Sequence, residues 1–311
     1  MKKRVVSMLL CGCLAVSALA GCGSSSSEEV VTNTDAEDAA EDAAEDAAED
    51  AENTAEDADA EAASDTASDM EYVLEKGTLI VGITNFEPMD YMDESGEWIG
   101  FDADLANAFA ESLGIKAEFV EIDWDSKILE LDSNAIDCVW NGMTLTDEVT
   151  SSMECTDPYL MNAQVVVVPA DVADDYQDVE SLSDLSFAVE AGSAGEAEVS
   201  ALGLTYTPVS AQSDALLEVA SGTSDAAVID LLMAAAMVGE GTGYENLTYT
   251  VSLNSEEYGV GFRQGSDLAA VLNDFFTQCY EDGTMQETAE KYGVQAALIS
   301  AQTAAEETAE E

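Results

Sequence analysis

The 311-residue chain contains no histidine, and only eight lysine and arginine residues stand against 66 aspartate and glutamate residues. Its formal net charge at pH 7 is −58. Phosphate backbones would repel such a chain, so nucleic acid is excluded as a partner. Without histidine, the chain also lacks the commonest general base and the usual zinc ligand. We therefore expect no metal site and no bound cofactor.

Cysteine is scarce in the part of the chain that can form a core. Beyond residue 71 only Cys138, Cys155 and Cys279 occur. An odd number is a poor disulfide framework, and the apolar neighbours of Cys138 favour buried free thiols. A single bridge between Cys138 and Cys155 stays open as the alternative.

The first 21 residues have the pattern of a secretory signal peptide. Three basic residues at 2–4 precede an apolar stretch at 5–20, which is too short to span a bilayer as a helix. The stretch closes with Leu-Ala-Gly-Cys at residues 19–22, which resembles the bacterial lipobox. We expect residues 1–21 to be removed and Cys22 to become the lipidated N-terminus. An ordinary signal peptide, in which Cys22 is incidental, is the alternative.

Two acidic segments flank the part of the chain that can fold. Residues 22–71 are rich in Ala-Glu-Asp repeats whose four-residue period places like charges at i and i+4, where they repel each other. Low hydrophobicity with high charge predicts a disordered acidic linker that holds the folded part away from the membrane. Residues 301–311 have the same composition and are interpreted as a disordered acidic tail. Cation binding by the acidic run is the alternative.

Strand and helix patterns alternate between residues 72 and 300, as in an α/β fold with mostly parallel sheets. Strands are expected at residues 78–83, 116–122 and 136–140, with a short helix at 126–131. A longer helix is expected to start with Asp102 as its N-cap and to end at Gly114.

The pattern starts again at the apolar run of residues 164–169 and returns with a strand at 258–262. We therefore expect lobe 1 to comprise residues 72–166 and 258–300, and lobe 2 to comprise residues 167–257. The chain would cross between the lobes twice, which makes a hinge.

Five short motifs follow one another within residues 73–293. They are Gly-Thr-Leu-Ile-Val-Gly at 77–82, Gly-Phe-Asp-Ala-Asp-Leu-Ala at 100–106, Asn-Gly-Met-Thr-Leu-Thr at 141–146, Asp-Pro-Tyr at 157–159 and Gly-Thr-Ser-Asp-Ala at 222–226. In this order they resemble the type II periplasmic binding proteins of polar amino-acid ABC transporters, the bacterial extracellular solute-binding proteins of family 3. The resemblance implies a monomer of two lobes that close on one small ligand.

The resemblance also implies where the ligand lies, because open α/β sheets bind ligands at the carboxyl ends of their strands. At positions matching Asn141, Gly142 and Thr144, relatives give backbone and hydroxyl hydrogen bonds to the ligand. At the position of Asp230 they have an aspartate that pairs with the ligand's α-ammonium group. A carboxylate that caps a helix is the alternative for Asp230.

Further positions match the walls of the family's pocket. Phe86 and Trp124 stand where aromatic rings flank the ligand side chain, and Met89 matches another wall position. Gly192 and Ser193 offer loop amides of the kind that hold carboxylates. The alternatives are core packing for the aromatic rings and a plain turn for Gly192 and Ser193.

One position departs from the family pattern. Relatives usually carry an arginine three residues after the last threonine of the 141–146 motif, where it clamps the ligand carboxylate, and here that residue is Val149. Ala194 likewise stands where many relatives have threonine. Removing one partner of a buried charge pair costs about 2–5 kcal/mol. Lys127 is the nearest cation in sequence that could compensate, although we expect it to be solvent-exposed.

These features predict a lipid-anchored, extracytoplasmic solute-binding protein on the outer face of the cytoplasmic membrane. It would capture a small polar, amino-acid-like ligand and present its closed form to an ABC transporter permease. A sensory solute-binding lipoprotein is one alternative. An enzyme similar to cyclohexadienyl dehydratases is another, but the chain lacks histidine and any nucleophile motif, so we expect no enzymatic activity.

Overall fold

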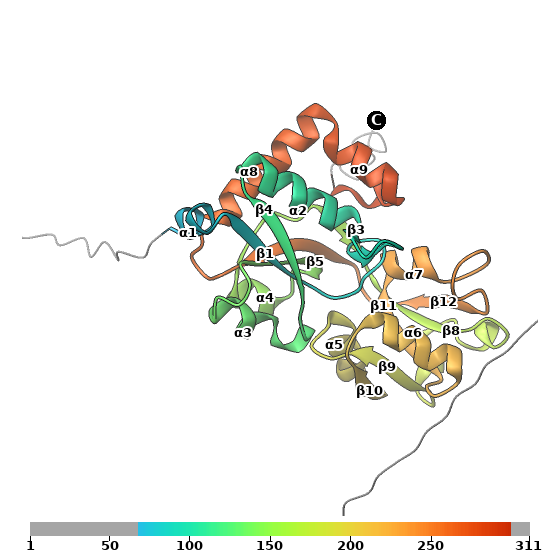
Figure 1. Ribbon diagram of the computed structural model, residues 1–311. Helices are drawn as coiled ribbons and strands as arrows, with labels where there is room; N and C mark the ends of the chain where they lie inside the picture. The colour runs from blue at the N-terminus through green and yellow to red at the C-terminus, as the bar shows by residue number, and fades with distance from the viewer. Residues whose placement is uncertain (1–67, 300–311) are drawn as a thin grey trace, which may run out of the picture. The chain divides into compact units, whose positions relative to one another are not determined.

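The computed structural model describes residues 68–299, which belong to one compact unit. The expected signal peptide, Cys22, most of the linker and the acidic tail lie outside the described residues. Figure 1 shows two α/β lobes, each built on its own sheet.

The larger sheet has six strands in the order β4-β1-β5-β13-β6, with β7 also paired to β13. β1 runs parallel to β4 and β5, whereas β13 is antiparallel to β5. In Figure 1, helices α2, α8 and α9 lie on one side of this sheet and α3 and α4 on the other. The bounds are β1 Thr78–Ile83, β4 Lys116–Glu121, β5 Cys138–Thr144, β6 Glu154–Cys155, β7 Leu160–Asn162, β13 Glu256–Phe262, α2 Phe101–Ser112, α3 Lys127–Asp132, α4 Asp147–Ser152, α8 Leu268–Asp282 and α9 Thr284–Tyr292.

The second sheet has five strands in the order β10-β9-β11-β8-β12. Alternate side chains of β8 enter two core clusters: Val165 and Val167 pack in the cluster that holds the buried face of α6, and Val166 and Val168 in the cluster that holds Val199 of α5. This two-sided burial explains the unbroken apolar run in the sequence. The bounds are β8 Gln164–Pro169, β9 Ser186–Glu190, β10 Thr205–Val209, β11 Ala226–Asp230, β12 Leu247–Ser252, α5 Ala194–Ala201, α6 Gln212–Ser221 and α7 Leu231–Met237.

The chain crosses between the sheets twice. It passes from β7 to β8 at Ala163, and it returns between β12 and β13. The boundary expected between residues 166 and 167 therefore falls inside β8, because that strand pairs along its length with β11 and β12 of the second sheet. A short ribbon of β2 (Tyr91–Met92) and β3 (Trp98–Ile99) precedes α2.

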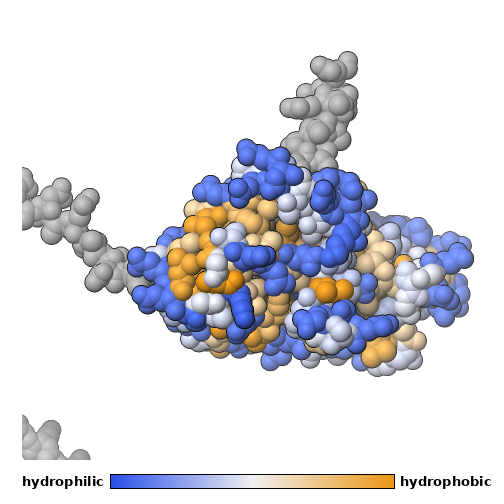
Figure 2. All heavy atoms as spheres, turned by 45° about the horizontal axis from the view of Figure 1, so that its top comes forward, coloured by the Kyte–Doolittle hydropathy of each residue, from blue (hydrophilic) through white to orange (hydrophobic). Residues whose placement is uncertain are grey.

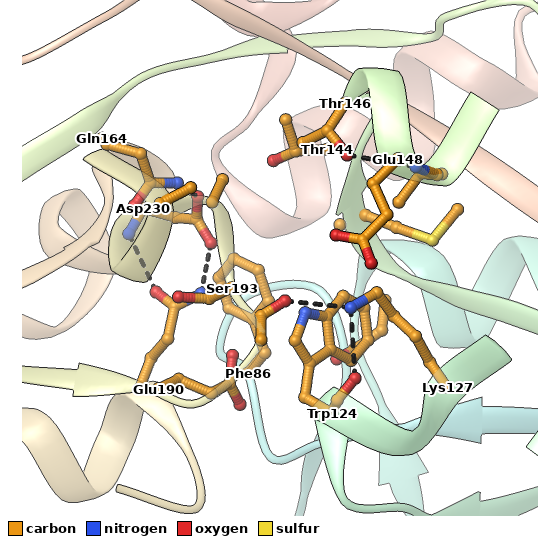
Figure 3. Close-up of a pocket in the computed structure, with 18 of the residues that line it drawn as sticks. Phe86, Trp124, Lys127, Thr144, Thr146, Glu148, Gln164, Glu190, Ser193 and Asp230 are labelled. Atoms are coloured by element: carbon orange, nitrogen blue, oxygen red, sulfur yellow. Dashed lines mark hydrogen bonds between the residues drawn. The ribbon is translucent and has the colours of Figure 1, made fainter. Parts of the chain in front are cut away.

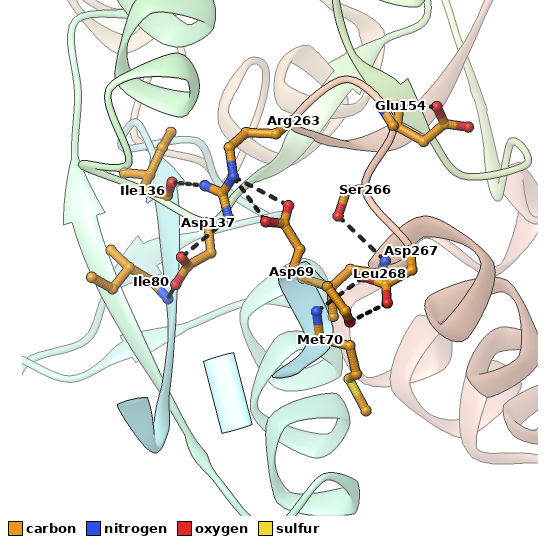
Figure 4. A network of polar contacts seen from close by, with 12 residues as sticks. Asp69, Met70, Ile80, Ile136, Asp137, Glu154, Arg263, Ser266, Asp267 and Leu268 are labelled. Atoms are coloured by element: carbon orange, nitrogen blue, oxygen red, sulfur yellow. Dashed lines mark hydrogen bonds and ion pairs between the residues drawn. The ribbon is translucent and has the colours of Figure 1, made fainter. Parts of the chain in front are cut away.

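Helix α1 (Asp69–Lys76) begins inside the segment expected to be linker, so the expected boundary at residue 71 is wrong. Figure 4 shows why the helix is fixed there: the Arg263 Nε atom lies 3.1 Å from an Asp69 carboxylate oxygen. On the other side, the fully buried Asp137 carboxylate lies 3.7 Å from an Arg263 nitrogen and 2.5 Å from the Lys76 ammonium. Together these contacts anchor α1 to the first lobe.

Helix α2 differs from the expectation at its start. Gly100, with φ of +138°, is the N-cap. A Cβ added to Gly100 would lie only 2.0 Å from the Met89 carbonyl oxygen, so a larger residue would clash there. Asp102 is in the first turn and fully buried, and its carboxylate accepts hydrogen bonds from the Gly142 amide (2.6 Å) and the Tyr159 hydroxyl (2.8 and 2.9 Å). Asp102 therefore supports the β5 strand end and does not cap the helix.

Cys138, Cys155 and Cys279 are free thiols in the structure, and burial raises the pKa of each. Within residues 68–299, no helix is long and apolar enough to cross a bilayer. Figure 2 shows a largely hydrophilic face with smaller hydrophobic areas between the polar ones. Among the described residues, the most exposed large apolar side chains, Leu129 and Leu217, come from different helices, α3 and α6.

Candidate functional site

A cavity of about 220 Å³ lies between the two lobes, at the carboxyl ends of β5, β9 and β11. This is below the ~300–1,000 Å³ typical of pockets for drug-sized ligands, so the cavity suits a small solute. Eight of the nine expected ligand-binding residues line it: Phe86, Trp124, Asn141, Gly142, Thr144, Gly192, Ser193 and Asp230. Figure 3 shows Asp230 and Glu190 on one side, and Trp124, Lys127 and Glu148 on the other.

Met89 is the expected residue that does not line the cavity. It is fully buried, and its Cγ atom would lie 3.2 Å from a Cβ added to Gly142. Gly142 has φ of +55°, and a Cβ there would also meet the Phe86 ring at 2.7 Å. Met89 therefore packs behind the wall, where it fixes the position of Gly142.

Asn141 and Gly142 shape the cavity from the end of β5. The Asn141 side chain accepts from the backbone and hydroxyl of Thr84 (both 2.9 Å) and donates to the Asp90 carboxylate (2.8 Å). The Gly142 amide is occupied by Asp102. Burial raises the pKa of Asp102 to about 6 and that of Asp90 well above its ordinary value. This buried network ties the end of β5 to Thr84, Asp90 and Asp102.

Asp230 ends β11 and is held by carboxamide groups. Its carboxylate accepts hydrogen bonds from Asn162 Nδ2 (2.6 Å) and from the side chains of Gln164 and Gln212. Burial, followed by the nearby Glu256 carboxylate, raises the pKa of Asp230. Although Asp230 occupies the N-cap position of α7, its side chain makes no capping hydrogen bond. The side chain is therefore oriented by the amides around the cavity and does not serve the helix.

Lys127 is buried, with only 7% of its surface exposed, so the expectation of a solvent-exposed lysine is wrong. Its ammonium donates to the carbonyl oxygens of Trp124 (3.2 Å) and Gly192 (2.9 Å) and lies 5.0 Å from the centre of the Trp124 ring. Gly192 belongs to the opposite lobe, so this hydrogen bond joins the two lobes. Burial lowers the pKa of Lys127.

The backbone amides of Gly192 and Ser193 already donate hydrogen bonds to neighbouring residues of the same lobe. The Gly192 amide donates to the Glu196 carboxylate (2.7 Å) and the Ser193 amide to the Glu190 carbonyl (3.3 Å). The Ser193 hydroxyl caps α5 by accepting from the Glu196 amide (3.1 Å). Gly192 has φ of +71°, and a Cβ there would lie 2.6 Å from the Cα of Asp125 in the other lobe. Gly192 and Asp125 thus form a tight contact between the lobes.

Sequence reasoning did not identify Glu190, Glu148, Gln164 or Gln212, all of which line the cavity. Glu190 could have been found by the rule that identified Asp230, because it is a polar residue at the carboxyl end of a strand. Burial raises the pKa of Glu190 to about 8, against the opposing effect of Lys127. Gln164 and Gln212 carry no comparable sequence signal, since their role depends on where Asp230 lies.

Val149 lines the cavity and is buried, so an apolar wall stands at the position of the family's arginine. Among the described residues that line the cavity, Lys127 is the one cation. Any carboxylate on the ligand therefore has a single positively charged partner within reach.

Comparisons with known proteins agree with this architecture. The family model of the bacterial extracellular solute-binding proteins, family 3, matches residues 79–295. The chain is 31% identical over 218 residues to the "Probable histidine-binding protein" of Neisseria gonorrhoeae, covering 67% of this chain and 79% of that one. The chain belongs to the bacterial extracellular solute-binding proteins of family 3.

Two solved structures share the two-lobed fold. One is an ABC uptake transporter substrate-binding protein from Streptococcus pneumoniae with bound histidine, at a TM-score of 0.68 and 27% identity, covering 74% of this chain and 98% of that one. The other is the ancestral amino acid-binding protein AncCDT-1, a precursor of cyclohexadienyl dehydratase, at a TM-score of 0.66 and 31% identity, covering 72% and 99%.

Proposed function

We propose that this chain is a lipid-anchored solute-binding protein that captures a small polar, amino-acid-like ligand between its lobes and delivers it to an ABC importer. The observation that carries the proposal is the cavity between the lobes, where polar and aromatic side chains from both lobes converge. A ligand that contacts both walls binds the closed form better than the open form and therefore stabilises closure.

The lining residues support distinct roles in holding such a ligand. Asp230, kept in place by three carboxamides, pairs with the α-ammonium group. Phe86 and Trp124 flank the side chain. Lys127 takes over from the missing arginine and pairs with the ligand carboxylate, because it is the lining cation and its ammonium already bridges the lobes.

A thermal-shift and tryptophan-fluorescence screen of the purified protein against the twenty amino acids and related amines tests this proposal. We expect saturable binding of one ligand per chain. Asp230→Asn should weaken it at least 30-fold, since truncating a buried charge pair costs about 2–5 kcal/mol. The exposed Asp184→Asn is the control and should bind normally. If no compound in the screen binds, the assignment of an amino-acid-like ligand is wrong.

The proposed partners are the membrane, through lipid on Cys22, and an ABC transporter permease. In this arrangement the protein is a monomer on the outer face of the cytoplasmic membrane. Labelling of cells with a palmitate analogue tests the anchor: the full-length chain should incorporate the label and Cys22→Ser should not. Crosslinking to membrane proteins with and without ligand distinguishes transport from sensing, because a permease should be captured preferentially by the ligand-bound form.

The likeness to AncCDT-1 keeps an enzymatic alternative open to test, since that protein is a precursor of cyclohexadienyl dehydratase. We propose that this chain is not an enzyme. Incubation of the purified protein with a cyclohexadienyl substrate should give no product above the rate of the buffer alone, and turnover that Glu190→Gln abolishes would contradict the proposal.

A further inference from the structure

Glu190 is a buried acid with one carboxylate oxygen that the protein leaves without a hydrogen bond. It ends β9, lines the cavity and is only 2% exposed. Its Oε1 atom has no hydrogen-bond partner among the described residues. A buried carboxylate oxygen without a partner is strongly unfavourable when the group is charged. A group supplied from the cavity would remove this cost.

The charges around Glu190 come from several elements. Lys127 of α3 faces it from the other lobe, while Asp214 of α6 and Asp230 of β11 add negative charge from its own lobe. Thr84 and Gln212 are its polar neighbours. The Lys127 ammonium donates instead to two carbonyl oxygens, so the structure contains no direct ion pair between Lys127 and Glu190 within the described range.

The cavity as a whole favours a cation over an anion. Four acidic residues line it against one lysine: Asp147, Glu148, Glu190 and Asp230 against Lys127. On the side where relatives hold an anion, Val149 and Ala194 are apolar. The amides of Gly142, Gly192 and Ser193 already have acceptors within the protein.

We infer, building on the proposed function, that Glu190 is a specificity-determining residue that binds a cationic nitrogen on the side chain of the ligand. The pocket thereby selects a solute with a second positive charge, an ammonium or guanidinium group, over a neutral solute of the same shape. Asp230 binds the α-ammonium group of the ligand and Lys127 its carboxylate, while Glu190 binds the cationic group of the ligand side chain.

Binding of a cationic ligand changes the protonation of Glu190. Burial raises the pKa of Glu190 to about 8, so at pH 6 the carboxyl group is almost entirely protonated in the free protein. A cationic ligand pairs with the ionised form, and binding therefore releases a proton. The ionised fraction of an acid with a pKa of about 8 rises about 50-fold between pH 6 and pH 8. The affinity for a cationic ligand should rise by up to that factor, while the ligand itself keeps its charge.

Isothermal titration calorimetry with two matched ligand pairs tests the inference. L-arginine is compared with L-citrulline, and L-ornithine with L-norvaline, on the wild type, Glu190→Gln and the exposed control Glu180→Gln. For at least one pair we expect the cationic member to bind at least about 30-fold more tightly to the wild type and to Glu180→Gln. In Glu190→Gln the difference should fall to a few-fold.

A second arm follows the same titrations between pH 6 and pH 8 and in two buffers of different ionisation enthalpy. Wild type should gain affinity for the cationic ligand with pH and release a proton on binding, and Glu190→Gln should do neither. The neutral ligand corrects for any titration of Asp230. This arm and the wild-type ligand pairs remain informative if Glu190→Gln fails to fold.

Equal binding of both members of each pair, or a preference that survives in Glu190→Gln, overturns the inference and leaves the proposed function standing. If none of the four ligands and none of the amino acids in the screen binds, both the inference and the proposed ligand class are wrong.

Discussion

Replacing Lys127 by methionine tests how the pocket holds a carboxylate without the family's arginine. Methionine keeps the unbranched shape of the side chain and its contact with the Trp124 ring but removes the charge. It also removes the hydrogen bond of 2.9 Å to the Gly192 carbonyl, which joins the two lobes across the cavity. The substitution should therefore act on the ligand-bound, closed form.

The magnitude follows from the two interactions lost. A hydrogen bond from a charged donor contributes about 1.5–3 kcal/mol, and removing one partner of a buried charge pair costs about 2–5 kcal/mol. Because both interactions involve the same ammonium group, their energies do not add, and the expected total loss of binding free energy is about 2–5 kcal/mol. The dissociation constant should then rise between about 30-fold and several thousand-fold. The free protein should not be destabilised, since burial of the charged ammonium is itself unfavourable, as the lowered pKa of Lys127 indicates.

The assay is calorimetry with the best ligand from the screen and with its carboxamide derivative, in which the carboxylate is replaced by a neutral amide. Wild type should bind the amide much more weakly than the parent compound. Lys127→Met should bind both with similar, low affinity, so the two changes are strongly non-additive. Lys116→Met, on the exposed part of β4, is the matched control and should behave as wild type.

Two results would refute the reasoning. If Lys127→Met binds the parent ligand as tightly as wild type does, the lysine is not the carboxylate anchor. If the variant loses affinity equally for the parent ligand and its carboxamide, Lys127 acts only by holding the lobes together.

Three further predictions concern stability and closure. The pKa of Glu190 is raised from 4.5 to about 8, so its contribution to the free energy of unfolding is fully present below pH 4.5 and is lost as the pH rises to 8. In urea unfolding of the ligand-free protein between pH 5 and 8, wild type should lose up to about 1.4 kcal/mol of unfolding free energy per pH unit more than Glu190→Gln. Gly192→Ala should lower ligand affinity at least tenfold in calorimetry, because the added Cβ would lie 2.6 Å from the backbone of the opposite lobe, whereas Gly203→Ala, with φ of +69° and open space around it, should not. Arg263→Met should destabilise the protein by about 3–5 kcal/mol, because it removes a partner of the buried Asp137 carboxylate, and it should leave ligand affinity unchanged; an unchanged urea midpoint would contradict the role assigned to this ion pair.

Much of the fold follows from local patterns. The β-branched run at residues 78–83 coincides with β1, and the apolar run at 164–169 coincides with β8. The strand predicted at residues 78–83 is confirmed, because a β-branched run leaves a direct mark on sequence. The two-sided burial of β8 explains why its sequence is an unbroken apolar run. The lobe boundary near residue 166 was misplaced because the same run is compatible with either sheet, and only its pairing with β11 assigns it to the second.

Some residues of the candidate site could be identified from sequence, and others only from the structure. Asp230, Asn141 and Trp124 were accessible from sequence, since motifs and strand ends mark them. The burial of Lys127 was not, because a lysine that closely follows Asp123 and Asp125 in sequence has the local pattern of a surface residue. Its burial depends on the approach of Gly192, 65 positions away, from the opposite lobe.

The sequence by itself determined the α/β class, the family and the strand ends that meet at the cavity, because periodicity and short motifs are properties of neighbouring residues. Only the tertiary structure decided which charges face each other across the cavity. Glu190 and Lys127 come from different lobes, and the pKa of each depends on burial that only the packed lobes provide. The electrostatic character of the pocket is therefore a property of the tertiary structure.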